Sequence, residues 1–227
     1  MRGRQVFMES LMAHGVDAIF GNPGTTENPL LDSLIDYPSI KYYVALQESI
    51  AMSAASFYAQ AKGITSVVNL HVAPGLGNAI GMAFGALKAN SPVLITAGQQ
   101  DTRMRLREPL LSYDLVEMAK PVVKWSIEPR TADEMSPILG RAFKIAMTPP
   151  RGPVFVSLPV DVMSTETLVL AANNKGQLIP PSADLDQIQG LADRLSKANA
   201  PAIIAGDDVT VYDGFDSLTK IAEITGA

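Results

Sequence analysis

The feature that most constrains the fold of this chain is a repeated alternation of short apolar segments with longer helical segments. The apolar segments are bounded by turn residues and occupy positions 17–20, 41–46, 65–70, 92–97, 122–126 and 154–158. Short, nearly continuous apolar runs that alternate with helices are typical of buried strands in a parallel sheet. We therefore expect an α/β fold with an open, mostly parallel sheet and helices on both faces.

Polar residues that are unusual for turns follow three of the expected strands. The loop Gly21–Thr25 follows the first strand, Glu48 follows the second, and the segment His71–Asn78 follows the third. In open α/β sheets, ligands bind at the carboxyl ends of the strands. The three loops therefore predict a single site on one edge of the sheet.

Glu48 is the most informative residue of this edge. Its neighbours Ala45, Leu46, Ile50 and Ala51 are apolar, and they predict a carboxyl group with little access to water. Burying an ionised carboxylate without a partner is strongly unfavourable. Glu48 must therefore be paired, stay protonated, or hold a ligand that needs a carboxyl group, and its neighbours alone leave these three possibilities open.

Composition excludes several other classes of function. The 227 residues include no cysteine and only two histidines, which excludes thiolate chemistry and a histidine-rich metal site. A net charge of −5, with no basic run, argues against binding to nucleic acid or to an anionic membrane. The N-terminus does not resemble a signal peptide, and no apolar run approaches the roughly 20 residues of a membrane span. We expect a soluble cytoplasmic protein.

A glycine pattern offers a different interpretation of the third loop. Gly75, Gly77 and Gly81 follow a predicted strand, and Asp101 stands further along the chain, as in nicotinamide-dinucleotide sites. The last glycine comes one residue too late for that motif, and the unit would be third in the fold rather than first. The nicotinamide interpretation is therefore the weaker one.

The character of the sequence changes near Ser164. Residues 165–183 lack periodicity and contain Asn and Pro pairs, which predicts a linker after a first domain of residues 1–164. Residues 184–227 predict a helix over 184–197, a strand over 202–205 and a helix over 215–224. One strand and two helices cannot close a sheet, so we interpret this segment as the beginning of an incomplete central α/β domain.

A series of short motifs resembles the N-terminal half of the thiamine diphosphate-dependent 2-oxo acid decarboxylases, with benzoylformate decarboxylases as the most similar group. The similarity runs in order from about Val6 to Asp161, and Pro201–Asp207 is similar to the opening of that family's central domain. The motifs are Phe20–Thr25, Ala45–Glu48, Tyr58–Ala61, Asn69–His71, Gly77–Ala79, Thr96–Gln100, Val123–Ser126 and Arg151–Val154.

The resemblance implies a pyrimidine-binding domain and thiamine diphosphate as the cofactor. By this resemblance, Glu48 hydrogen-bonds N1′ of the aminopyrimidine ring and promotes formation of the C2 ylide that attacks a 2-oxo acid. His71 would relay protons at the reacting centre. Thr25 stands where benzoylformate decarboxylases have a serine that contacts the substrate carboxylate. The other residues expected to line the cofactor and substrate are Asn22, Pro23, Gly24, Gly75 and Asn78.

The resemblance also implies a site that this chain does not complete. The family holds the diphosphate through Mg²⁺ on a separate C-terminal domain with a Gly-Asp-Gly … Asn signature. That signature does not occur here, so no metal ligand is predicted in this chain. In the family the two cofactor-binding domains come from different subunits. We therefore expect a homodimer or tetramer, and we expect the 227-residue chain alone to be inactive.

Two kinds of alternative stay open. Within the same superfamily, an acetohydroxyacid synthase-like carboligase or an acyl-CoA lyase shares the Pro-Gly turn. Those enzymes typically lack a histidine at the position of His71, which favours a decarboxylase. The second kind is a non-catalytic stand-alone module, and the abrupt end of the chain inside a second domain argues against it.

Overall fold

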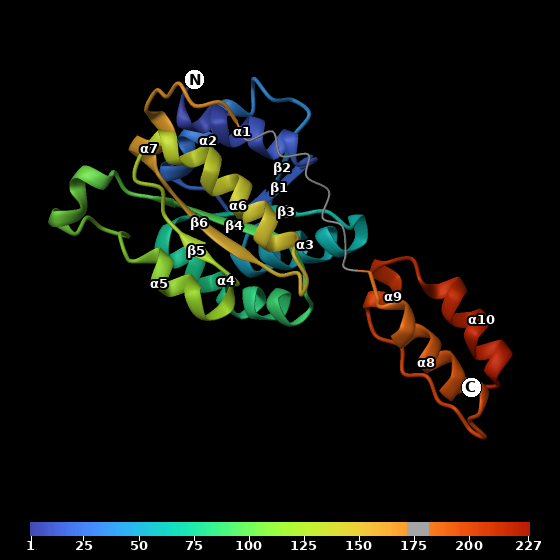
Figure 1. Ribbon diagram of the computed structural model, residues 1–227. Coiled ribbons are helices and arrows are strands. Elements are labelled where there is room, and N and C mark those ends of the chain that lie inside the picture. The colour runs from blue at the N-terminus through green and yellow to red at the C-terminus, as the bar shows by residue number, and fades with distance from the viewer. Residues whose placement is uncertain (172–181) are drawn as a thin grey trace. The chain divides into compact units, whose positions relative to one another are not determined.

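The computed structural model describes residues 1–171 and 182–227 (Figure 1). The chain forms two compact units, Met1–Leu178 and Ile179–Ala227. The larger unit carries a sheet with helices on both of its faces, and the described part of the smaller unit contains helices and connecting segments. No helix within the described ranges is long and apolar enough to cross a lipid bilayer.

The sheet of the larger unit is parallel throughout, which confirms the predicted α/β fold. Its six strands lie in the order β2-β1-β3-β4-β6-β5. The central strands β3 and β4 are buried along their whole length, and this burial explains their continuous apolar sequences. The strands are β1 (Ala18–Gly21), β2 (Lys41–Val44), β3 (Ser66–Leu70), β4 (Val93–Gln99), β5 (Ser126–Ile127) and β6 (Val154–Pro159).

Two hydrophobic cores, one on each face, hold the helices against the sheet. The first face is covered by α1 (Gly3–Ala13), α2 (Asn28–Ser33), α6 (Met135–Met147) and α7 (Val160–Ser164). The opposite face is covered by α3 (Glu48–Lys62), α4 (Val72–Lys88) and α5 (Leu115–Ala119). Short 3₁₀ helices connect these elements: η1 (Thr25–Glu27), η2 (Thr102–Arg107), η3 (Lys120–Val122) and η4 (Ala132–Glu134).

Two local predictions in this unit were wrong. The expected glycine-rich turn over 72–78 is the beginning of α4, with His71 as the N-cap residue. Pro74 is compatible with this start because the first turn of a helix has no internal partner for its N–H groups. The expected strand over 122–126 is reduced to β5, because Val122 belongs to η3 and the strand begins only at Ser126.

The smaller unit contains α8 (Leu185–Ser196), α9 (Asp208–Val211) and α10 (Phe215–Thr225). The two longer helices confirm the predicted helices over 184–197 and 215–224. The predicted strand over 202–205 does not form, because the described residues of this unit offer no second strand to pair with it.

The domain boundaries at 164 and 184 stay predictions. Residues 165 and 167 form backbone hydrogen bonds with residues 3 and 1, and residue 166 pairs with residue 2. The Asn and Pro pairs that suggested a linker lie outside the described residues.

Candidate functional site

The carboxyl ends of β1, β2 and β3 bring most of the predicted site residues to one edge of the sheet. The loop 22–27 follows β1, Glu48 begins the helix that follows β2, and His71 ends the connection from β3 to α4. β1 lies between β2 and β3, so the chain changes direction across the sheet at β1. Such reversal points are where open α/β sheets bind ligands.

Glu48 is the first residue of α3 and its side chain is held by two amide groups. Asn22 Nδ2 donates to Oε1 at 3.1 Å, and Asn78 Nδ2 donates to Oε2 at 2.9 Å. Glu48 is only 7% exposed. The two amide donors satisfy both oxygens of this buried carboxyl group. Of the three possibilities that the sequence left open for Glu48, the structure shows a paired carboxyl group. Its partners are two side-chain amides from the segments after β1 and β3.

The burial of Glu48 has a different origin from the one expected. Ala51 is fully buried, but Leu46 is 92% exposed and Ile50 is 59% exposed, so these two side chains do not shield the carboxyl group. Gly75 of α4 lies against it instead, because a Cβ atom at that position would stand 3.4 Å from Glu48 Oε1. Leu46 and Ile50 form an exposed apolar surface beside a buried acid.

His71 is held by Glu27, a residue that the sequence did not single out. His71 Nδ1 lies 2.8 Å from Glu27 Oε2, and the Glu27 side chain is only 1% exposed. Glu27 Oε2 also accepts the Gly24 N–H at 2.7 Å, and Oε1 accepts the Thr26 hydroxyl at 2.8 Å. A Cβ atom on Gly24 would lie 2.3 Å from the His71 ring, so this close approach requires glycine.

A sequence signal for Glu27 does exist. Gly24 and Glu27 stand three residues apart at the start of a helical turn, the spacing at which an acidic side chain turns back to bond a backbone N–H. That pattern predicts that Glu27 caps the helical turn. Its second role, as the partner of His71, is visible only from the tertiary contact.

Thr25 does not join the other predicted residues. It is exposed at the start of η1 and lines a shallow depression with Arg4, Asn28, Pro29, Leu31, Asp32 and Val160. The hydroxyl nearest to His71 is that of Thr26, whose Oγ1 lies 3.3 Å from Nδ1. Pro23, half-buried, lies between Asn22 and Gly24. A larger hollow of about 930 Å³ lies along α6 and includes neither Glu48 nor His71.

The charge of Glu27 also acts on a tyrosine beneath the site. Burial and the nearby Glu27 carboxylate raise the pKa of Tyr42, so its phenol keeps its proton. The Tyr42 hydroxyl accordingly donates to Asn69 Oδ1 at 3.1 Å. Asn69 in turn donates to Thr96 Oγ1 at 3.2 Å, which satisfies a fully buried polar pair under the edge of the sheet.

The arrangement can bind a polar group and hold or move protons. It offers one carboxylate fixed by two amides, and one imidazole fixed by a second carboxylate. Across residues 1–171 and 182–227, no three His, Asp or Glu side chains gather as a metal ion would need. The carboxylate and imidazole groups that are present can form hydrogen bonds and transfer protons.

Comparison with known proteins identifies the family of this chain. Residues 1–118 match the family described as thiamine pyrophosphate enzyme, N-terminal TPP binding domain. A curated benzoylformate decarboxylase of Pseudomonas aeruginosa is 38% identical over 222 residues, which cover 95% of this chain and 41% of that protein. The acetolactate synthase large subunit of Lactococcus lactis is 29% identical over 226 residues, covering 97% of this chain and 39% of that protein.

Solved structures agree with these relatives. A putative thiamin diphosphate-dependent enzyme from Mycobacterium smegmatis has a TM-score of 0.90 at 37% identity, covering 100% of this chain and 44% of that one. Benzoylformate decarboxylase from Polynucleobacter necessarius has a TM-score of 0.89 at 34% identity, and the match covers 98% of this chain and 42% of that one. This chain thus spans less than half the length of each of these four relatives. The resemblance is confirmed, and the chain belongs to the family of thiamine pyrophosphate enzyme N-terminal TPP-binding domains.

Proposed function

We propose that this chain is the N-terminal, pyrimidine-binding portion of a thiamine diphosphate-dependent lyase that decarboxylates a benzoylformate-like 2-oxo acid. The observation that carries the proposal is the buried Glu48 carboxylate, held between Asn22 and Asn78 at the carboxyl edge of a parallel sheet. The similarity to two benzoylformate decarboxylases supports the choice of substrate class. When bound, the cofactor supplies the electron sink for the electron pair left by departing CO₂.

The residues present fit the aminopyrimidine end of that cofactor. A weakly basic ring nitrogen needs a carboxyl group that can share a proton with it, and a buried carboxyl group suits this task. In this proposal Glu48 holds the proton, Asn22 and Asn78 orient the carboxyl group, and Gly75 leaves room beside it. By the family resemblance, we assign the diphosphate and Mg²⁺ to a separate C-terminal domain of the intact protein.

His71 and Thr25 are assigned to the substrate side. Glu27 occupies Nδ1 of His71, so Nε2 is the nitrogen that can exchange a proton with the substrate, and the side chain is 27% exposed. Thr25 presents its hydroxyl from the exposed start of η1, next to Gly24. Its predicted contact with the substrate carboxylate is kept as part of the proposal. Pro23 and Gly24 belong to the loop that carries Thr25, and Gly24 leaves room for the His71 ring.

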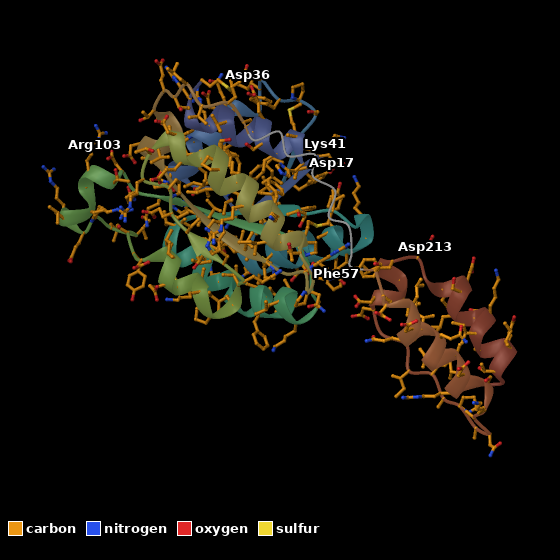
Figure 2. All side chains as sticks on the ribbon, viewed as in Figure 1. Asp17, Asp36, Lys41, Phe57, Arg103 and Asp213 are labelled. Atoms are coloured by element: carbon orange, nitrogen blue, oxygen red, sulfur yellow. The ribbon has the colours of Figure 1, made fainter. Side chains whose placement is uncertain are left out.

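An exposed apolar surface beside Glu48 supports a site shared between subunits. Leu46 and Ile50 adjoin the buried acid, and Val44 and Phe57 continue the surface along β2 and α3. Phe57 projects from the edge of the larger unit in Figure 2. Exposed apolar side chains on neighbouring elements are typical of protein interfaces. We propose that a second copy of the protein covers it, as a homodimer or tetramer.

A carboligase is the second candidate. It is favoured by the 29% identity to an acetolactate synthase large subunit, which extends over nearly the whole chain. An acyl-CoA lyase of the same superfamily is a further candidate beside the carboligase. The presence of His71, paired with a buried carboxylate, favours the decarboxylase, because a proton relay at the reacting centre needs a group that can take up and return a proton.

Product analysis of the intact protein that carries this chain distinguishes these candidates. Supplied with thiamine diphosphate and Mg²⁺, it is expected to release CO₂ from benzoylformate and to yield an aldehyde. Formation of acetolactate from pyruvate, without turnover of benzoylformate, would support the carboligase. Cofactor binding without turnover of any 2-oxo acid would contradict both. The 227-residue chain on its own is expected to show no turnover.

A further inference from the structure

We infer that Glu27 is a positioning residue that fixes the tautomer of His71, so that Nδ1 carries the hydrogen and Nε2 presents its lone pair to the site. The tautomer is a property of this chain alone. Only the use of Nε2 as the proton-exchanging atom rests on the proposed function.

With Glu27 as a carboxylate, the hydrogen bonds around it leave one consistent placement of protons. Its Oε2 accepts the Gly24 N–H and its Oε1 accepts the Thr26 hydroxyl, so both oxygens act as acceptors. His71 Nδ1, at 2.8 Å from Oε2, must then be the donor. A neutral imidazole has one N–H, so the lone pair resides on Nε2. No partner within the described parts of the chain occupies that nitrogen.

The backbone around the pair is shaped for it. A Cβ atom on Gly98, in β4, would lie 1.9 Å from Glu27 Oε1, and a Cβ atom on Gly24 would lie 2.3 Å from the His71 ring. Both glycines therefore admit the carboxylate and the ring where any other residue would displace them. Val72, directly after His71, is fully buried with a φ of 43°, a strained value for a β-branched residue.

The second histidine of the sequence provides an internal control. His14 Nδ1 lies 2.8 Å from the Ser10 carbonyl oxygen, and its ring stacks on Phe143 at 4.0 Å between centroids. A carbonyl oxygen can only accept, so His14 also carries its hydrogen on Nδ1. That tautomer depends on the main chain of α1 and not on Glu27.

Nitrogen NMR of the chain labelled with ¹⁵N-histidine tests the assignment. The spectrum is recorded at about pH 8, above the ordinary histidine pKa of about 6.5, and the two rings are distinguished with His14→Gln. We expect hydrogen on Nδ1 in both rings. In Glu27→Leu, which removes the acceptor, His71 is expected to shift toward the Nε2–H form while His14 is unchanged. Hydrogen on Nε2 of wild-type His71, or an unaltered His71 in Glu27→Leu, would overturn the inference.

Glu27→Gln provides a test that does not depend on the folding of the leucine variant. An amide oxygen still accepts from Nδ1 but carries no charge, so the tautomer is kept and the Nδ1-bound proton resonance moves upfield. An unmoved resonance would show that Glu27 is not its partner and would overturn the inference.

Kinetics of the intact protein test the role assigned to Nε2 separately. Glu27→Gln keeps the tautomer and should retain most of the activity. In Glu27→Leu, kcat is expected to fall roughly 10- to 100-fold, the range found when the hydrogen-bond partners of metal-bound histidines are changed, with KM little altered. An unchanged kcat in Glu27→Leu would overturn that role. If the protein shows no 2-oxo acid turnover but carries the hydrogen on Nδ1 of His71, the proposed function is contradicted and the tautomer assignment still holds.

Discussion

Glu27 and Glu48 are buried carboxylates that no Lys or Arg neutralises within the described residues. Each is held instead by N–H and O–H donors: Glu48 by two side-chain amides, and Glu27 by a backbone amide, a hydroxyl and an imidazole. Charge-assisted hydrogen bonds of this kind offset the cost of burial.

The sequence located the residues around Glu48 but missed the partner of His71. The positions after strands predicted that the loops share one edge, the resemblance pointed to Asn22, Asn78 and Gly75 within them, and the structure brings all three to Glu48. The burial of Glu27 depends on Gly98, at the end of a strand far along the chain. A contact of that kind leaves no local pattern in the sequence.

Asp17 offers a pH-dependent test of the described fold, remote from the site. The Lys62 ammonium and the Tyr58 hydroxyl hold the pKa of Asp17 below its ordinary value of 3.8. A lowered carboxyl pKa stabilises the fold above the ordinary value, and this contribution disappears as the pH falls through the lowered pKa. Asp17→Asn is therefore expected to lower the melting temperature slightly at pH values above about 5, with the difference from wild type vanishing in acid.

Asp36→Asn is the matched control for this measurement. Asp36 is exposed and forms no ion pair in the part of the chain that the structure describes. Both aspartates lie on the larger unit in Figure 2. The melting temperature of Asp36→Asn should follow that of the wild type at every pH. A constant difference between Asp17→Asn and wild type down to the lowest pH would contradict the assigned cause.

At the scale of elements, helix α4 shows where local patterns were insufficient. Pro74, Gly75 and Gly77 read as a turn, yet they form the first turns of a helix. Isolated glycines disfavour a helix by about 1 kcal/mol each, but here Gly75 lies against Glu48 and Gly77 against Met118. Tertiary packing against small residues overrides the local preference. Over 202–205 the local sequence favours a strand, but none forms in the described structure, because a strand needs a neighbouring strand that local sequence does not supply.

A pair of glycine substitutions on α4 separates helix preference from crowding of the site. Gly81→Ala adds a methyl group where no atom lies within 4 Å, so it is expected to stabilise the fold by about 0.5–1 kcal/mol in urea unfolding. Gly75→Ala places its methyl group 3.4 Å from Glu48 Oε1, so it should gain less stability and weaken cofactor binding in the intact protein. Equal stability gains and unchanged cofactor affinity would contradict the packing described for Gly75.

At the scale of the whole molecule, the apolar surface of β2 and α3 is expected to be an interface between copies. Phe57 lies in this surface and several turns from Glu48, so it can be changed without touching the site. Phe57→Glu is expected to weaken self-association of the intact protein roughly tenfold or more, because buried aromatic residues are among the strongest contributors to interfaces. Analytical ultracentrifugation measures this directly.

Ile35→Glu is the control for that variant. Ile35 is at least as exposed as Phe57 but follows α2, on the opposite face of the sheet. It should leave self-association unchanged. Equal weakening by both variants, or by neither, would contradict the assignment of the interface to β2 and α3.

The central claim is that the Glu48 carboxyl group exchanges a proton with bound thiamine diphosphate. The most direct measurement is kcat for CO₂ release from a 2-oxo acid by the intact protein and by its Glu48→Gln variant, both at saturating cofactor. Equal melting temperatures of the two proteins would show that the substitution leaves the fold intact. Gln keeps the shape and one acceptor but cannot exchange a proton, so kcat is predicted to fall by about 10²- to 10⁴-fold. A variant that retains kcat within about twofold of wild type would contradict the account.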